Sequence, residues 1–255
     1  MNQLPPVLPT EVYGIIAEQA TDKATLVSLL QLSTAHYAEV ERVLYKDVVM
    51  CRPYRSDVLG NLLQGLITNP RRALLVQKLR LDFANYVPDK LVSKLAAVLR
   101  EVHNLIHLHL NIFGITLLNL VEGCSFQLRR LEYSDQNPMT DFSLPQVFRA
   151  HPTIRYLRIG IYTIKDPLPP DTLPQLSTLD CPAYLGRTLM GGRKITRVFW
   201  RHTSPEFLTT PPYGPHNSLL TLKISVSPIG FDLPAACPNL RFLECYLMVR
   251  DVCIT

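Results

Sequence analysis

One spacing of apolar residues recurs eight times along the chain between residues 76 and 245. In each copy two apolar anchors stand three residues apart, and a third anchor follows after one intervening residue. Alternation of this kind predicts a short β-strand that is buried on one side. The anchors of the copies are Val76/Leu79/Leu81, Leu105/Leu108/Leu110, Leu128/Leu131/Tyr133, Ile154/Leu157/Ile159, Leu176/Leu179/Cys181, Ile195/Val198/Trp200, Leu219/Leu222/Ile224 and Leu240/Leu243/Cys245.

The copies follow one another at intervals of 19 to 29 residues. The clearest of them, Leu105-Ile106-His107-Leu108-His109-Leu110, resembles the LxxLxL string of leucine-rich repeats. A unit of this length cannot bury its apolar side alone and is stabilised by stacking on its neighbours. The resemblance therefore implies an α/β fold, a leucine-rich-repeat solenoid of about eight irregular repeats over residues 76–255. Such a solenoid presents a surface for binding other proteins.

The connecting segments differ along the chain. Helical spacing of apolar residues predicts helices over Asp57–Ile67, Leu91–Val102 and Leu144–Ala150. We expect residues 49–75 to form a linker and a helix that caps the first edge of the solenoid. The later connectors contain proline clusters at residues 167–170 and 205–215, which disfavour long helices. The ten residues after the last copy are too few and too apolar for a polar capping repeat, so we expect a frayed end or a truncated sequence there.

Residues 4–48 have a different pattern. Leu8-Pro9-Thr10-Glu11 has the proline and the acidic residue that favour a helix start, and apolar residues at helical spacing follow as far as Leu44. The opening Leu8-Pro9-x-Glu11-Val12, the apolar Ile16, the Leu26/Leu29/Leu32-Ser33 run and the final Leu44-Tyr45 resemble the F-box motif. The resemblance implies a helical module that binds a Skp-family adaptor, and through it a cullin. The implied adaptor-binding residues are Leu8, Pro9, Val12, Ile16, Leu26, Leu29 and Leu32.

Residues between the strand anchors are expected to share one face of the sheet, because strand side chains have a period of two. Lysine and arginine outnumber acidic residues there, so this face is expected to favour an acidic or phosphorylated segment of a partner. The alternative is a surface whose charges only keep the protein in solution. The residues assigned to the partner-binding face are Lys78, Arg80, His107, His109, Arg130, Tyr156, Arg158, Arg197, Phe199, Arg201, Lys223 and Tyr246.

Composition removes several other classes of function. The net charge is +5, without a long run of lysine and arginine, so nucleic-acid binding is not indicated. His107 and His109 lack further zinc ligands at a recognisable spacing, and no acid, base and nucleophile form a catalytic motif. We therefore expect no enzyme activity, no metal and no cofactor. The sequence starts without a readable secretion signal, and polar residues interrupt its most apolar stretch, Leu105–Val121. These features predict a protein of the cytoplasm or nucleus, without a membrane segment.

Two functions remain as hypotheses. The first is the substrate-recognition subunit of a Skp–cullin–F-box ubiquitin ligase, in which the F-box-like module docks the adaptor and the repeats hold an unknown target protein. The alternative is a non-catalytic leucine-rich-repeat scaffold or interaction protein that has no role in a ligase.

Overall fold

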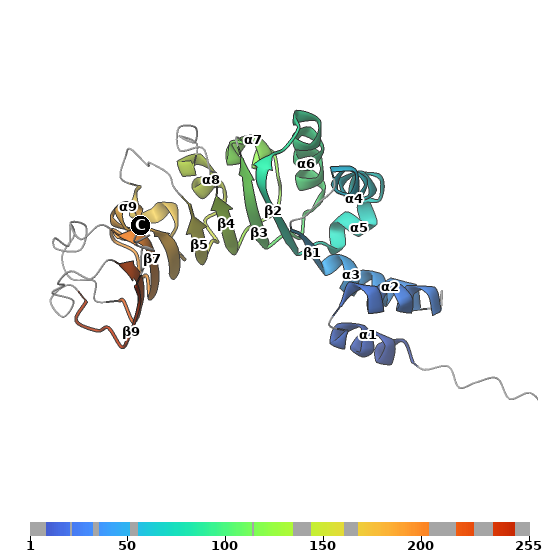
Figure 1. Cartoon of the computed structure of the whole chain (residues 1–255), viewed down its shortest axis with the longest axis horizontal. Coiled ribbons are helices and arrows are strands. Elements are labelled where there is room, and N and C mark those ends of the chain that lie inside the picture. Colours follow the sequence, from blue (N-terminus) through green and yellow to red (C-terminus); the bar gives the residue numbers. More distant parts are fainter. Residues whose placement is uncertain are drawn as a thin grey trace, which may run out of the picture.

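The computed structural model is elongated, with one row of strands, helices along that row and a helical segment at one end (Figure 1). It describes residues 9–20, 22–32, 36–51, 56–113, 115–134, 144–160, 168–203, 218–226 and 237–247. The segment after the last predicted strand, residues 248–255, and the proline cluster at 205–215 lie outside the described residues.

Within these residues nine parallel strands form one open sheet, and their order in the sheet is their order in the sequence. The sheet and its helices confirm the predicted α/β class. Each of the eight predicted copies corresponds to one strand of the sheet. The strands are β1 (Asp47–Met50), β2 (Lys78–Tyr86), β3 (His107–Phe113), β4 (Arg130–Ser134), β5 (Tyr156–Ile159), β6 (Thr178–Pro182), β7 (Arg197–Thr203), β8 (Thr221–Val226) and β9 (Phe242–Leu247).

The second anchors of all eight copies stand side by side across the sheet. The register pairs Leu79 with Leu108, Leu108 with Leu131, and so on to Leu222 with Leu243. These anchors, except the last, are at most 1% exposed and belong to one continuous apolar core. Stacking in register therefore gives every inner repeat a buried apolar side, which a single repeat lacks.

Strand β1 was not predicted. The sequence boundary between the helical segment, residues 4–48, and the linker, residues 49–75, falls inside it. Val48 pairs with Leu79 and is buried, so it continues the row of anchors by one strand. The first edge of the sheet is thus formed by the residues that directly follow the helical segment.

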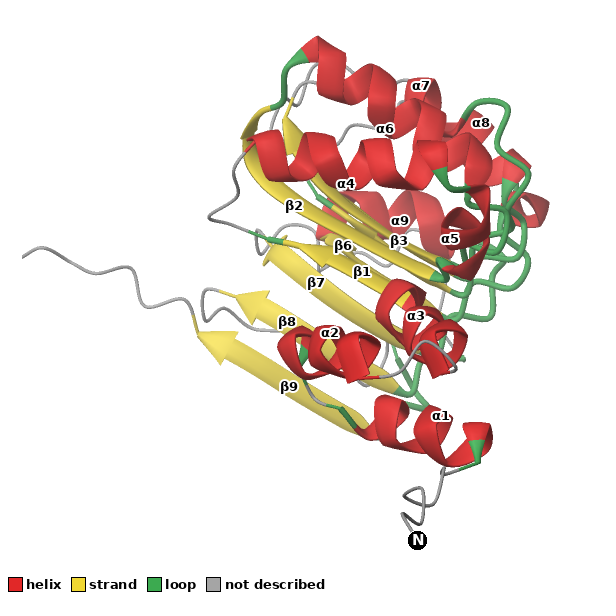
Figure 2. Cartoon of the chain, turned by 90° about the vertical axis from the view of Figure 1, so that its right-hand side faces the viewer, coloured by secondary structure: helices red, strands yellow, loops and turns green. Residues whose placement is uncertain are grey.

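A row of helices covers the apolar side of the sheet (Figures 1 and 2). The predicted helices over residues 57–67, 91–102 and 144–150 correspond to α4, α6 and α8, whereas α5, α7 and α9 were not predicted. The helices are α4 (Ser56–Thr68), α5 (Pro70–Leu75), α6 (Asp89–Glu101), α7 (Leu117–Val121), α8 (Leu144–Ala150), the short 3-10 helix η2 (Pro170–Thr172) and α9 (Ala183–Met190).

The buried side chain of Arg193, in the turn that follows α9, forms hydrogen bonds to backbone carbonyl groups of two segments. The guanidinium of Arg193 donates to the carbonyl oxygens of Leu189 at 2.8 Å, Leu168 at 3.3 Å and Pro169 at 2.5 Å. It thereby joins the end of α9 to the connector before η2. Buried carbonyl groups need such partners because an unpaired polar group in the interior costs about 1–3 kcal/mol.

The N-terminal segment is a separate bundle of three helices, which we call the helical module: α1 (Thr10–Gln19), α2 (Lys23–Leu32) and α3 (Tyr37–Lys46). Its apolar core consists of Ala17, Leu26 and Val40 and is distinct from the core of the sheet. Ionic contacts of the buried Glu41 of α3 connect the two parts: it accepts from Arg72 Nε of α5 at 2.7 Å, and Arg71 Nε of the same helix lies 3.8 Å from its other oxygen. The last residue of α3 is followed directly by β1, so the module is held at the first edge of the sheet.

Equivalent anchors are expected to contribute unequally to stability. Leu131 is fully buried in the middle of the sheet, whereas Leu243 of the last described strand is 43% exposed. Leu131→Ala should lower the free energy of unfolding by about 2–5 kcal/mol, because it opens a cavity in the core. Leu243→Ala should cost about 1 kcal/mol or less, because it removes little buried surface. Urea denaturation followed by fluorescence of Trp200, on β7, measures both; equal losses would contradict the assigned register.

Candidate functional site

The side of the sheet opposite the helices carries the polar side chains, and we call it the polar face. Alternate residues of each strand point to it, as expected from the period of two. In register, Lys78, His107, Arg130, Tyr156 and Arg197 form one row across the strands. Arg80, His109, Glu132, Arg158, Asp180, Phe199 and Lys223 form the next row. The predicted face residues thus lie on strands β2, β3, β4, β5, β7 and β8, while the side chain of Tyr246 lies outside the described residues.

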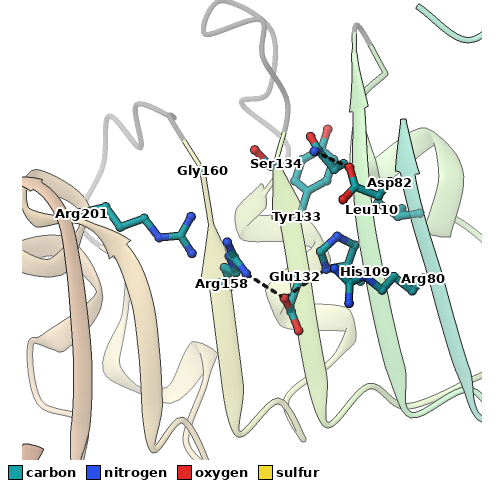
Figure 3. A pocket seen from close by; sticks show the side chains of 11 residues that line it. Arg80, Asp82, His109, Leu110, Glu132, Tyr133, Ser134, Arg158, Gly160 and Arg201 are labelled. Atoms are coloured by element: carbon teal, nitrogen blue, oxygen red, sulfur yellow. Dashed lines mark hydrogen bonds and ion pairs between the residues drawn. The ribbon is translucent and has the colours of Figure 1, made fainter. Parts of the chain in front are cut away.

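A carboxylate occupies the centre of this face. Glu132 is 6% exposed and binds side chains from three strands. Its Oε1 accepts from Arg130 Nε at 2.7 Å and from His107 Nε2 at 3.2 Å. Its Oε2 accepts from His109 Nδ1 at 3.0 Å and from Arg158 Nη1 at 3.4 Å. Four donors therefore surround one buried negative charge, and Figure 3 shows His109 and Arg158 on its two sides.

The surroundings of Glu132 fix its protonation state. Burial by itself raises the pKa of this carboxyl group, but the hydrogen bonds from His107, His109 and Arg130 outweigh burial. The net effect is a pKa far below the ordinary value for glutamate, so the group is an anion at neutral pH. A carboxylate held this low is a poor general base, because efficient proton transfer needs a pKa near the working pH. Glu132 is therefore suited to holding cationic side chains rather than to accepting a proton.

A second carboxylate continues the network toward β7. Asp180 Oδ2 accepts from Arg201 Nη2 at 2.5 Å and lies 3.5 Å from Arg158 Nε. Arg158 is consequently shared between Glu132 and Asp180, at longer distances than the other pairs. Asp180 Oδ1 is buried and has no hydrogen-bond partner among the described residues. The three inner strands β4, β5 and β6 thus carry charges of alternating sign, which attract one another.

The outer strands are paired in the same manner. Lys78 Nζ lies 3.7 Å from Asp47 Oδ2 of β1, and Lys223 Nζ lies 2.5 Å from Glu244 Oε2 of β9. Arg130 also stacks on the ring of Tyr156, with its guanidinium carbon 3.9 Å from the ring centre. Within the described part of the chain, Arg80 and Arg197 are the arginines of the face that make no ion pair.

Three of the five arginines assigned to the partner-binding face are paired with carboxylates of the chain itself. Arg130, Arg158 and Arg201 are engaged by Glu132 and Asp180, which are buried among them. The alternation of Arg130 and Glu132 along one strand was the available signal for the first of these pairs. The pairs of Arg158 and Arg201 join neighbouring strands and depend on the register.

A hollow of about 260 Å³ opens in the polar face beside this network. Four of its lining residues, Asp82, Asn111, Ser134 and Gly160, directly follow the third anchor of their repeats. Asn111, Ser134 and Gly160 were not predicted as residues of the face, and Asp82 was expected there only as one of its acids. Their common position relative to the anchors was the signal that could have identified them. The remaining lining residues are Arg80, His109, Leu110, Glu132, Tyr133, Arg158 and Arg201 (Figure 3).

The helical module places the predicted adaptor-binding residues in different environments. Pro9 and Ile16 are exposed, and Val12 is partly buried. Leu26 belongs to the core of the module and Leu29 packs against it, so Leu26 is a packing residue rather than part of an exposed patch. Leu8 and the side chain of Leu32 lie outside the described residues. Ile15 and Val27 are exposed apolar residues that the sequence analysis did not choose.

Comparison with known proteins adds no relative: no model of a protein family matches the sequence, and no curated protein matches it. Among the helices of the described ranges, the longest have 13 residues, and none has the length and apolar character needed to cross a bilayer. In the same ranges, no three His, Cys, Asp or Glu side chains are grouped as metal ligands.

The buried carboxylate should make stability depend on acid pH. Because the folded-state pKa of Glu132 is depressed, its stabilisation is complete above the unfolded-state pKa of about 4.3 and is lost as the pH falls below that value. Glu132→Gln should lower the free energy of unfolding by about 1–3 kcal/mol at pH 7, and the difference from wild type should shrink at pH 3. Urea denaturation at both pH values measures this. Glu122→Gln, at an exposed glutamate after α7, is the matched control and should show no such convergence.

Proposed function

We propose that this chain is the substrate-recognition subunit of a Skp–cullin–F-box ubiquitin ligase, acting in the cytoplasm or nucleus. In this proposal the helical module is an F-box that docks a Skp-family adaptor, and the strands form a leucine-rich-repeat solenoid that holds the target. Other subunits of the ligase perform the transfer of ubiquitin.

The observation that carries the proposal is that the helical module has an apolar core of its own. Its three helices have an apolar core of their own, formed by Ala17, Leu26 and Val40, and α1 packs on α3. Ile15, Ile16 and Val27 remain exposed on the outside of this small bundle. Exposed apolar patches generally mark interaction sites, and in this proposal these side chains contribute to one. An adaptor would cover them without disturbing the core of the sheet.

The repeat assignment is supported by the register of the strands. All eight LxxLxL copies stand in sequence order in one parallel sheet, with helices on the apolar side. Intervals of 19 to 29 residues suit one strand and one connector for each repeat. The polar face then provides a broad surface of fixed charges, which favours the recognition of a protein segment over the enclosure of a small molecule.

A substitution in α1 tests adaptor binding. Ile16 is 41% exposed and belongs to neither apolar core, so Ile16→Asp should leave the free energy of unfolding nearly unchanged. Its affinity for a Skp-family adaptor should fall tenfold or more, which corresponds to about 1.4 kcal/mol of interface energy. Surface plasmon resonance with the purified adaptor measures the change. Val58→Asp is the matched control, because Val58 is similarly exposed on α4, outside the module.

Normal adaptor binding by Ile16→Asp would contradict the docking of α1. Affinity capture of the wild-type chain from cells separates the ligase from the scaffold hypothesis. Cullin should be recovered with the chain, and Ile16→Asp should lose it. Recovery of the adaptor without cullin would favour the scaffold.

A further inference from the structure

The hollow in the polar face is formed by small residues in the middle of the sheet. Asn111, Ser134 and Gly160 lie on or next to strands β3, β4 and β5 and leave room above the backbone. The absence of a side chain at residue 160 lets Ser134 pack closely beside it, because a Cβ there would lie 2.7 Å from Ser134 Oγ. Larger residues surround this space, so a partner group of limited size can enter it from the open side.

Three guanidinium groups border the hollow, from three different strands. Arg80 comes from β2, Arg158 from β5 and Arg201 from β7. Arginine presents five donors in a planar fork, so an arginine that already binds one carboxylate retains donors for a second anion. Figure 3 shows the three side chains extending into the space in front of the strands.

The carboxylates near the hollow cancel only part of the positive charge of these arginines. Glu132 is compensated mainly by Arg130, which does not line the hollow, and its oxygens already accept from four donors. Asp180 is compensated by Arg201, and Asp82 accepts from Asn111 Nδ2 at 2.8 Å. Counted by arginines and carboxylates, four arginines of this cluster face three carboxylates. One positive charge is therefore left over, and Arg80 is the arginine without an ion pair.

We propose that the hollow binds one carboxylate side chain, an aspartate or glutamate, of the target segment, with Arg80 as its principal ion-pair partner. This inference rests on the proposed function, because it assigns to the target-binding face the chemistry of its partner. Arg158 and Arg201 contribute their remaining N–H donors, and the Ser134 hydroxyl group lies in the same lining.

Charge balance favours a carboxylate over a phosphate. A single carboxylate neutralises the one excess positive charge of the cluster. A phosphorylated residue carries about −1.5 to −2 at pH 7, so it would leave a surplus of negative charge beside Asp82 and Glu132. In a partly buried site such a surplus is costly, because nearby like charges are weakly screened.

The test uses three capped pentapeptides, Gly-Ser-X-Ser-Gly, in which X is glutamate, phosphoserine or glutamine. Each is titrated into the full chain at pH 7.5 while the arginine Nε–Hε signals are followed by NMR. The glutamate peptide should shift the signals of Arg80, Arg158 and Arg201, and the glutamine peptide should not. Phosphoserine should bind no more tightly than glutamate.

Two variants of β2 should change the affinity in opposite directions. Arg80→Gln removes the excess charge and should weaken binding of the glutamate peptide about tenfold. Asp82→Asn keeps an acceptor for Asn111 and should strengthen it up to about fivefold, the effect of two unit charges about 4 Å apart in water. Arg80 is exposed, so the first change should not affect folding. Arg149→Gln is the matched control, because Arg149 is exposed on α8, in the row of helices on the other side of the sheet.

Three results would overturn the inference: no shift of these arginine signals, an unchanged affinity in Arg80→Gln, or tighter binding of phosphoserine at pH 7.5. Capture of the Skp-family adaptor by the same protein separates this inference from the proposed function. If the adaptor binds and the glutamate peptide does not, the inference fails and the ligase proposal stands. If the peptide binds in the hollow and the adaptor does not, the anion site stands and the ligase role fails.

Discussion

The lateral register of the parallel strands is the constraint on which the rest of the molecule depends. One apolar anchor on each strand pairs with the equivalent anchor on the next, from Val48 to Leu243. This alignment buries one side of the sheet under the helices. Because side chains alternate along a strand, the same alignment also places the intervening residues in straight rows on the other side. A slip by one residue would exchange the two sides and destroy the core and the polar face together.

On the polar face, the same register brings side chains of opposite charge together. Glu132 can remain ionised in a buried position because His109 and Arg158 stand at its level on the two neighbouring strands, and Arg130 stands two residues before it on its own strand. Moving a charged group from water into the protein interior costs several kcal/mol, and only good geometry and several hydrogen bonds offset this cost. The network therefore contributes more to defining the arrangement of the face than to net stability. Arg158, shared between Glu132 and Asp180, connects the two halves of this arrangement.

The local patterns of apolar residues predicted much of the fold, whereas the contacts between neighbouring repeats could not be predicted from the sequence. Eight strands were predicted because each has three anchors at fixed spacing. Strand β1 was missed because Val48 follows a helix directly and lacks such a set of anchors. Helix α9 contains Gly186, a poor helix former, but a Cβ at this position would lie 2.7 Å from Trp200 Nε1, so packing against β7 explains the residue. Alternation predicted which residues share the polar face, and Arg130 and Glu132 pair two positions apart on one strand. The other pairs join residues about 20 or more positions apart and could not be read from spacing.

A surface of paired charges selects its partners differently from a basic patch. Arg130, Arg158 and Arg201 are already ordered by carboxylates of the same chain, so a partner does not bear the full entropic cost of fixing them. A partner that adds too much negative charge competes with Glu132 and Asp180 and has to break pairs that are partly buried. The face can therefore gain binding energy only where a cation is left over and donors remain unused. That condition is met where Arg80 borders the hollow, and there the small residues after the third anchors provide the space.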